Sequence, residues 1–150
     1  MSEINPKIFD ALQKKLKSFQ TGVHTYTGKA LVKCCALVQR EVQESMRDTE
    51  LDYSKTYYTH NKKKGHHPSQ AGKPPAVDTG TLRRSITYEV NEVQLVGKVG
   101  STLQNPPYGA FLEFGTSKMP SPRPFLKPAL EKCKPQIKEI LTEEMNRAKK

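Results

Sequence analysis

The hydrophobic positions of the N-terminal third follow the period of an α-helix. Apolar side chains recur at spacings of three and four residues, at Ile8, Leu12, Leu16 and Phe19. Lysines occupy positions between them, which is typical of an amphipathic helix with a basic outer face. Asn5 followed by Pro6 is a typical helix start. Gly22 then interrupts the pattern before a second apolar stripe, so two N-terminal helices are predicted, over residues 5–19 and 27–47.

The helical period is lost between residues 49 and 77. This segment is rich in lysine, tyrosine, glycine and proline, and the pair Pro74–Pro75 fixes part of it in extended geometry. A loop of this length inside a small domain is unusual, and it is either functional or disordered. We therefore predict a long basic Pro/Gly loop over residues 49–77.

A hairpin pattern follows the loop. Asp78 or Thr79 can cap a short helical turn. Residues 86–90 then alternate between apolar and polar side chains, and residues 93–100 form a second apolar run after a two-residue connection. This arrangement predicts a small antiparallel β-sheet, formed by a hairpin over residues 86–100.

Two further helices complete the pattern. Residues 107–114 have the spacing of a short helix, with Phe111 and Leu112 expected to pack in the core. A long C-terminal helix follows, and Pro135 is expected to kink it. The predicted fold class is α+β, in a single domain over residues 1–150. It combines two N-terminal helices, a small antiparallel β-sheet, a short helix and a long C-terminal helix.

The charge balance favours a polyanionic partner. The chain has 25 lysine and arginine residues against 15 acidic ones, a formal net charge of +10 at pH 7. A basic excess of this size suits a nucleic acid, a membrane surface or an acidic protein, and it does not distinguish among them. No segment has the apolar pattern of a signal peptide or the length of a membrane span. We expect a protein that stays in the cytoplasm until it is assembled, without a membrane partner.

Cysteine usage indicates a reducing compartment. Cys34 and Cys35 are adjacent and Cys133 stands alone, an odd count that provides no disulfide framework. All three fall in apolar-periodic segments, where a free cysteine usually behaves as a small buried hydrophobe. Three buried free thiols are therefore predicted.

Candidate catalytic and metal-binding patterns are weak. His60, His66 and His67 with the cysteine pair lack the spacing of a metal site, and solvated loop histidines are the simpler interpretation. The sequence has no nucleophile motif and no phosphate-binding loop, and its acidic residues are scattered. We expect no catalytic residue, no metal and no cofactor. A metal-dependent hydrolase stays open as an alternative, and it predicts bound metal and an activity that a chelator removes.

A lysine run in the long loop suggests contact with nucleic acid. Lys62, Lys63 and Lys64 lie near three tyrosines, which combines positive charge with stacking surface, and Arg83 and Arg84 add to it. A solvated loop is the simpler interpretation of such a run. A stand-alone, sequence-independent nucleic-acid-binding protein nevertheless stays open, and it predicts salt-sensitive binding by the isolated monomer.

Three segments together resemble a known family. They are "SQAGKPPAVDTGTLRRSI" over residues 69–86, "YGAFLEFGT" over 108–116 and "PSPRPFLKPAL" over 120–130. In this order and spacing they resemble the tail-component family of long-tailed bacteriophages, related to the minor tail protein Z or tail-completion type. The resemblance rests on the combination, because no one of the segments is diagnostic alone.

The resemblance implies a structural virion protein of the head–tail junction, or neck, which completes the tail and joins it to the head. Such a protein would form a homo-oligomeric ring of six-fold or related symmetry. Its other implied partners are the tail terminator, head-completion or connector proteins and tail tube proteins, with non-specific contact to passing DNA. It would be assembled in the host cytoplasm.

Two proline-rich straps, residues 65–77 and 115–124, are our candidates for contacts with neighbouring subunits. Proline loses little conformational freedom on ordering, so such a strap docks at low entropic cost. We interpret residues 49–77 as an assembly arm that the turn at Asp78 anchors, with Arg83 and Arg84 meeting acidic surface or DNA. The candidate interface residues are Pro74, Pro75, Asp78, Thr79, Gly80, Arg83, Arg84, Pro120, Pro122, Arg123 and Pro124. Candidate contacts to DNA or acidic surface are Lys62, Lys63, Lys64, Arg83 and Arg84.

Overall fold

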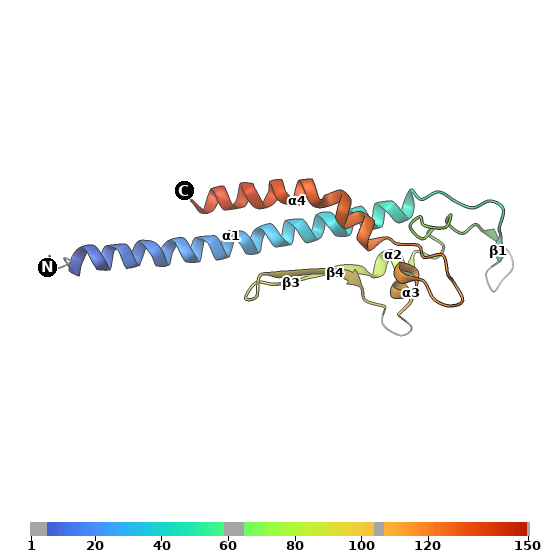
Figure 1. Cartoon of the computed structure of the whole chain (residues 1–150), viewed down its shortest axis with the longest axis horizontal. Helices are drawn as coiled ribbons and strands as arrows, with labels where there is room; N and C mark the ends of the chain where they lie inside the picture. Colours follow the sequence, from blue (N-terminus) through green and yellow to red (C-terminus); the bar gives the residue numbers. More distant parts are fainter. Residues whose placement is uncertain (1–5, 59–64, 104–106, 150) are drawn as a thin grey trace.

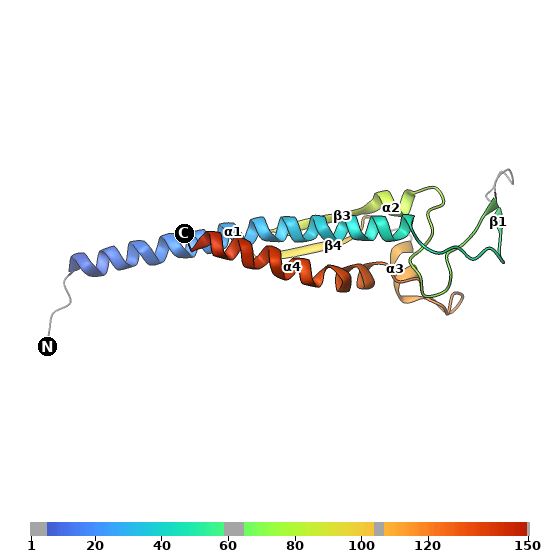
Figure 2. The same cartoon turned by 90° about the horizontal axis from the view of Figure 1, so that it is seen from above.

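One helix of 42 residues, α1 (Pro6–Arg47), organises the molecule. The computed structural model describes residues 6–58, 65–103 and 107–149. Helix α4 (Leu126–Ala148) packs along one side of α1, and the hairpin of β3 (Ile86–Asn91) and β4 (Val96–Ser101) packs along another (Figure 1). The fold is α+β, as the sequence predicts. The molecule is elongated in both views (Figures 1 and 2).

The two predicted N-terminal helices are one continuous helix. The predicted start at Pro6 is confirmed, but Gly22 does not end the helix. A single glycine costs a helix only about 1 kcal/mol relative to alanine. Packing of α4 and of the hairpin along the following turns of α1 offsets a cost of that size.

The hydrophobic core lies where α1, α4, β3 and α3 (Tyr108–Phe114) meet. Its fully buried side chains are Val38, Val42, Met46, Ile86, Leu112, Phe125, Ala129 and Cys133. The three cysteines are free and buried, as predicted. Burial raises the pKa of each thiol, because a thiolate is poorly solvated there. These groups therefore act as core side chains.

The predicted hairpin is present, with a longer turn. β3 and β4 pair antiparallel from Ile86 opposite Ser101 to Asn91 opposite Val96. Four residues connect the strands, and Leu95 has a left-handed φ of 53°. Asn91 Oδ1 accepts a hydrogen bond of 2.8 Å from the Gln94 amide and so closes the turn. The hairpin approaches α1 closely at Gly97, where a Cβ atom would overlap the sulfur of Cys35.

Helix α4 continues through Pro135 to Ala148. Proline removes one backbone hydrogen bond inside a helix, and α4 changes direction between its first turns and its C-terminal half (Figure 1). The expected kink is therefore present without a break. Among the described residues, no helix combines the length and the apolar character that crossing a membrane requires.

The long loop between α1 and α2 (Thr81–Ser85) has local structure in its described residues. It contains a short hairpin of β1 (Tyr57–Tyr58) and β2 (Gly65–His66), and an isolated bridge joins Leu51 to Ser69. These strands are two residues each, too short for an alternating pattern to reveal them. The short hairpin projects from the end of the molecule opposite the N-terminus (Figures 1 and 2).

Candidate assembly surfaces

The two proline straps are bonded to one another. The Gly72 amide donates to the Pro122 carbonyl at 3.1 Å. Arg123 donates from Nε and from Nη2 to the Ser69 carbonyl, each at 3.3 Å, and its own amide bonds to Leu112 of α3. Residues 68–77 and 115–124 therefore form one surface, which we name the strap pair.

A third segment holds the strap pair against the end of α1. Thr49 Oγ1 donates to the Pro74 carbonyl at 2.8 Å, and the Gln70 amide donates to the Glu50 carbonyl at 3.0 Å. Lys73 and Glu50 add an exposed ion pair at 3.0 Å. Residues 70–74 of the strap are thus bonded to the segment that follows α1 in the same subunit.

The proline-strap residues that the sequence singles out as contact candidates differ in exposure. Pro75 is buried, Pro120 is exposed, and the remaining strap candidates are intermediate: Pro74, Pro122, Arg123 and Pro124. The strap pair is exposed at residues 70–73 and 77 of the first strap and at residues 117, 118, 120 and 121 of the second.

The turn after the first strap is built around Gly80. Gly80 occupies the position before α2 with a left-handed φ of 76°, so neither Asp78 nor Thr79 is the capping residue that the sequence suggested. Thr79 Oγ1 still accepts a hydrogen bond of 3.3 Å from the Thr81 amide. A Cβ at Gly80 would lie 2.9 Å from Arg84 Nη1, so glycine lets this guanidinium fold back over the turn.

Arg83 and Arg84 lie next to each other on α2. Arg83 is half-buried and its carbonyl accepts from Gln43 of α1, whereas Arg84 is exposed. Neither guanidinium forms an ion pair with an acidic residue in the described ranges. Both charges remain available to a partner.

The β1–β2 hairpin and the residues just before it display three tyrosine side chains, and we name this region the tyrosine hairpin. Tyr53, Tyr57 and Tyr58 are 73%, 59% and 66% exposed. The ring of Tyr53 lies 4.9 Å from that of His67, which is held by a hydrogen bond of 2.9 Å between Nδ1 and the Lys55 carbonyl. Lys62, Lys63 and Lys64 lie outside the described residues. The tyrosine half of the predicted nucleic-acid patch is therefore on the surface.

The N-terminal part of α1 extends alone beyond the end of α4 (Figures 1 and 2). Its apolar stripe, Leu12, Leu16 and Phe19, is 53%, 59% and 51% exposed. The sequence pattern predicted an amphipathic helix, and the apolar face of such a helix is normally buried. Within the subunit the described residues leave it uncovered. We name these three residues the α1 stripe.

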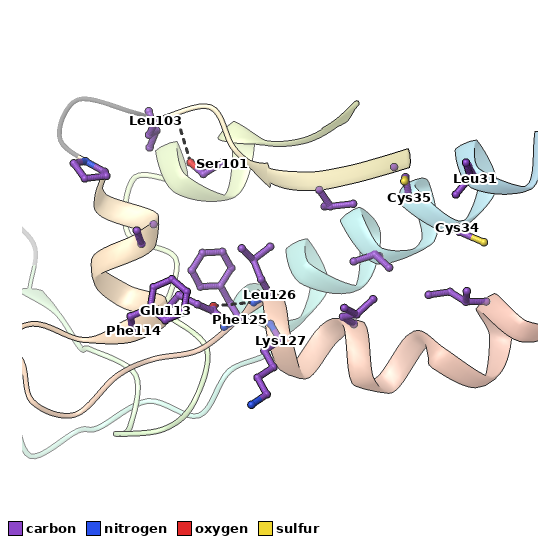
Figure 3. A pocket seen from close by; sticks show the side chains of 18 residues that line it. Leu31, Cys34, Cys35, Ser101, Leu103, Glu113, Phe114, Phe125, Leu126 and Lys127 are labelled. Atoms are coloured by element: carbon purple, nitrogen blue, oxygen red, sulfur yellow. Dashed lines mark hydrogen bonds between the residues drawn. The ribbon is translucent and has the colours of Figure 1, made fainter. Parts of the chain in front are cut away.

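An apolar groove of about 800 Å³ opens beside the core (Figure 3). Helix α1 forms its floor, β4 and α3 one wall, and α4 the other; representative lining residues are Leu31, Cys35, Val99, Phe114, Leu130 and Ile137. Phe114 is 82% exposed at its mouth. Sequence reasoning missed this groove, because its walls come from segments far apart in the chain.

Glu113 is the main acidic group of the groove, and its carboxylate caps the start of α4. Its carboxylate accepts hydrogen bonds from the amides of Phe125, Leu126 and Lys127 at 2.8, 3.0 and 3.0 Å, which satisfies the free backbone donors at the start of α4 (Figure 3).

Of the two α3 residues that the sequence assigned to the core, Leu112 is buried there as predicted. Phe111 is 42% exposed, so its predicted core role is wrong.

Helix α4 is fixed on α1 by a buried carboxylate. Glu144 is 2% exposed, and its Oε1 lies 2.5 Å from Lys33 Nζ and 2.7 Å from Arg147 Nη1. The hydrogen bond from Lys33 lowers the pKa of Glu144, with a further contribution from Arg147. Among the described residues no cluster of His, Cys, Asp and Glu could hold a metal ion.

One of the comparisons with known proteins identifies a family for this chain. A search of curated proteins found no match, and a search of solved structures found none. A family model described as "Bacteriophage HK97-gp10, putative tail-component" matches residues 10–115, a range that contains most of α1, the strap before α2, the β3–β4 hairpin and α3. This range is well over half of the 150 residues, and the chain belongs to the HK97-gp10-like family of bacteriophage tail components.

Proposed function

We propose that this tail component acts at the head–tail junction, where it completes the tail and joins it to the head as a subunit of a ring. The observation that carries the proposal is the position of its unpartnered surfaces. The α1 stripe lies at one end of an elongated molecule, and the strap pair and tyrosine hairpin lie at the other (Figure 1). Two unlike surfaces on one subunit suit the heterologous contacts of a cyclic ring.

The strap end of the molecule suits contacts to other layers of the neck. Pro120 is exposed on a segment held from both sides, so little conformational freedom is lost when a neighbour docks there. Arg83 and Arg84 lie on the adjacent helix α2 and can meet an acidic surface or the DNA that passes through the ring. The proposed neighbours are the tail terminator, the connector and the tail tube.

Electron microscopy of virions with a tagged copy of the protein tests the location. Label in a ring between head and tail is the expected result, and lysates that lack the protein should contain filled heads and unjoined tails. Label along the tail or at its tip would contradict the neck assignment while leaving a tail component. Complementation with Arg83→Glu/Arg84→Glu tests the arginines, and Lys98→Glu, at an exposed position of β4, is the control.

Sequence-independent nucleic-acid binding is the second candidate function. The observation that favours it is the set of exposed tyrosines at 53, 57 and 58, because bases stack on such rings. Gel retardation by the isolated protein, weakened by salt and by Tyr57→Ala/Tyr58→Ala, is the expected result for that function. Retention of binding in the double variant would exclude the tyrosine hairpin as the binding surface.

A further inference from the structure

The α1 stripe continues an interface that already exists in the subunit. Helix α4 ends opposite residues 22–27 of α1, since Thr27 Oγ1 lies 3.5 Å from Met145 Sδ and Gly22 faces the Ala148 carbonyl. The stripe begins immediately beyond this point. Phe19 lies four residues before Val23, and Leu16 lies three residues before Phe19. At this helical spacing all three side chains share one face of α1. The uncovered face is therefore the extension of the one that α4 covers.

The stripe cannot reach the apolar groove of its own subunit. Both lie on the same unbroken helix, with Leu16 of the stripe and Cys35 of the groove 19 residues apart. At 1.5 Å per residue this separation is about 28 Å. Any contact between the two must therefore join two copies of the chain.

The groove provides an apolar surface of the kind that would cover the stripe. Leu130 and Ile137 of α4 line one wall, and Leu130 is 45% exposed. In each subunit the inner face of α1 already packs on α4, and the groove offers the same pair of helices to an incoming apolar helix. The stripe spans about 10 Å along its helix, from Leu12 to Phe19, which places three large side chains in a groove of about 800 Å³.

We propose that the α1 stripe of one subunit docks in the apolar groove of the next subunit. This proposal deepens the ring function proposed above and rests on it. A second copy is the occupant that covers both surfaces at once, because every copy carries one stripe and one groove. A foreign protein or a membrane would cover only one of them. The contact is heterologous, so its repetition builds a ring where the rotation between subunits closes, as the proposed ring function requires.

Photo-crosslinking tests which surface the stripe meets. A benzophenone side chain replaces Leu16 in the full-length protein, in a mixture of isotopically light and heavy copies under assembling conditions. The expected result is cross-linked peptides that join light to heavy chains and map to the groove, at residues 31–38 of α1 or within residues 97–137. The control places the same group at Thr21, which is exposed on another face of α1. Cross-links from Leu16 mainly to the N-terminal part of another α1, or equal yields from both positions, would overturn the proposal.

A matched pair of double variants tests the energetic role of the stripe. Leu12→Asp/Leu16→Asp is expected to weaken self-association about tenfold or more, measured by sedimentation, because it places charges in an apolar contact. Ser18→Asp/Thr21→Asp adds the same charge to exposed positions and should leave association unchanged. Both variants should melt like the wild type, since all four side chains are exposed. Unchanged association of the first variant would overturn the proposal.

The location experiment separates this inference from the neck function. Wild-type label at the head–tail junction together with normal incorporation of Leu12→Asp/Leu16→Asp would refute the docking and leave the function intact. Cross-links into the groove without label at the junction would refute the function and leave the docking intact. Binding of the stripe to anionic vesicles, with no cross-link into the groove, would assign it to a membrane surface.

Discussion

Glu113 joins two segments whose connection no local pattern reveals. Its carboxylate accepts three amides from the start of α4, and α4 has no capping side chain at Phe125. Removal of a single helix cap costs about 1 kcal/mol, and here three donors lose their acceptor. Glu113→Ala should therefore lower the free energy of unfolding by roughly 1–2 kcal/mol in urea titrations.

The matched control for this prediction is Glu131→Ala. Glu131 is an exposed residue of α4 whose ion pair, among the described residues, is with Lys134 three residues on, so its loss should change stability by less than about 0.5 kcal/mol. Equal stability of the two variants would show that Glu113 does not cap α4.

Glu144 makes the contact between α1 and α4 sensitive to acid. Its pKa is lowered in the folded protein, chiefly by the hydrogen bond from Lys33. A carboxyl group with a lowered folded pKa stabilises the fold above its unfolded pKa, and this contribution is lost as the pH falls through the folded pKa. The loss should therefore occur below the ordinary value of 4.5.

Thermal unfolding across this pH range measures the effect of Glu144. Glu144→Gln should melt at a lower temperature than the wild type at neutral pH, and the difference should shrink as the pH falls below about 4. Glu143→Gln alters the exposed neighbour, which forms no ion pair with a described residue, and should keep the wild-type profile. A constant difference at every pH would contradict a charged Glu144.

At the scale of elements, α1 shows which features local sequence patterns predict and which they do not. Its apolar period, its start at Pro6 and the hairpin that packs on it follow from local patterns. Its continuity through Gly22 does not, because local patterns cannot weigh one unfavourable residue against packing elsewhere in the chain. The groove and the bonding between the two straps were missed for the same reason, because both depend on contacts between segments far apart in the chain, such as those of Glu113 with α4 and of Arg123 with Ser69.

Substitution of Gly22 tests the continuity of α1. A Cβ at this position would lie 3.7 Å from the Ala148 carbonyl oxygen, an ordinary contact, so alanine fits. Gly22→Ala should raise the free energy of unfolding by roughly 0.5–1 kcal/mol, because alanine loses less backbone entropy in a helix.

Gly80→Ala is the contrasting variant in the same unfolding assay. Gly80 has a φ of 76°, and its missing Cβ makes room for Arg84, so alanine should destabilise the protein there. A loss of stability in Gly22→Ala would favour the two separate helices that the sequence pattern predicted.

The whole molecule is built around a rod rather than a sphere. Helix α1 has 42 residues and is about 63 Å long, and its N-terminal part extends beyond every other described element (Figure 1). A compact chain of 150 residues has a radius of gyration of about 15 Å. Small-angle X-ray scattering of the free protein should therefore give a value well above 15 Å.

Dilution separates this elongation from self-association. If monomers carry the projecting α1 segment, the radius of gyration should stay high as concentration and apparent mass fall together to the monomer limit. The exposed stripe makes this shape costly in water, since three large apolar side chains remain solvated until a partner covers them. A compact monomer of about 15 Å would mean that the N-terminal segment folds back before assembly. Docking into a neighbour would then require that segment to open first.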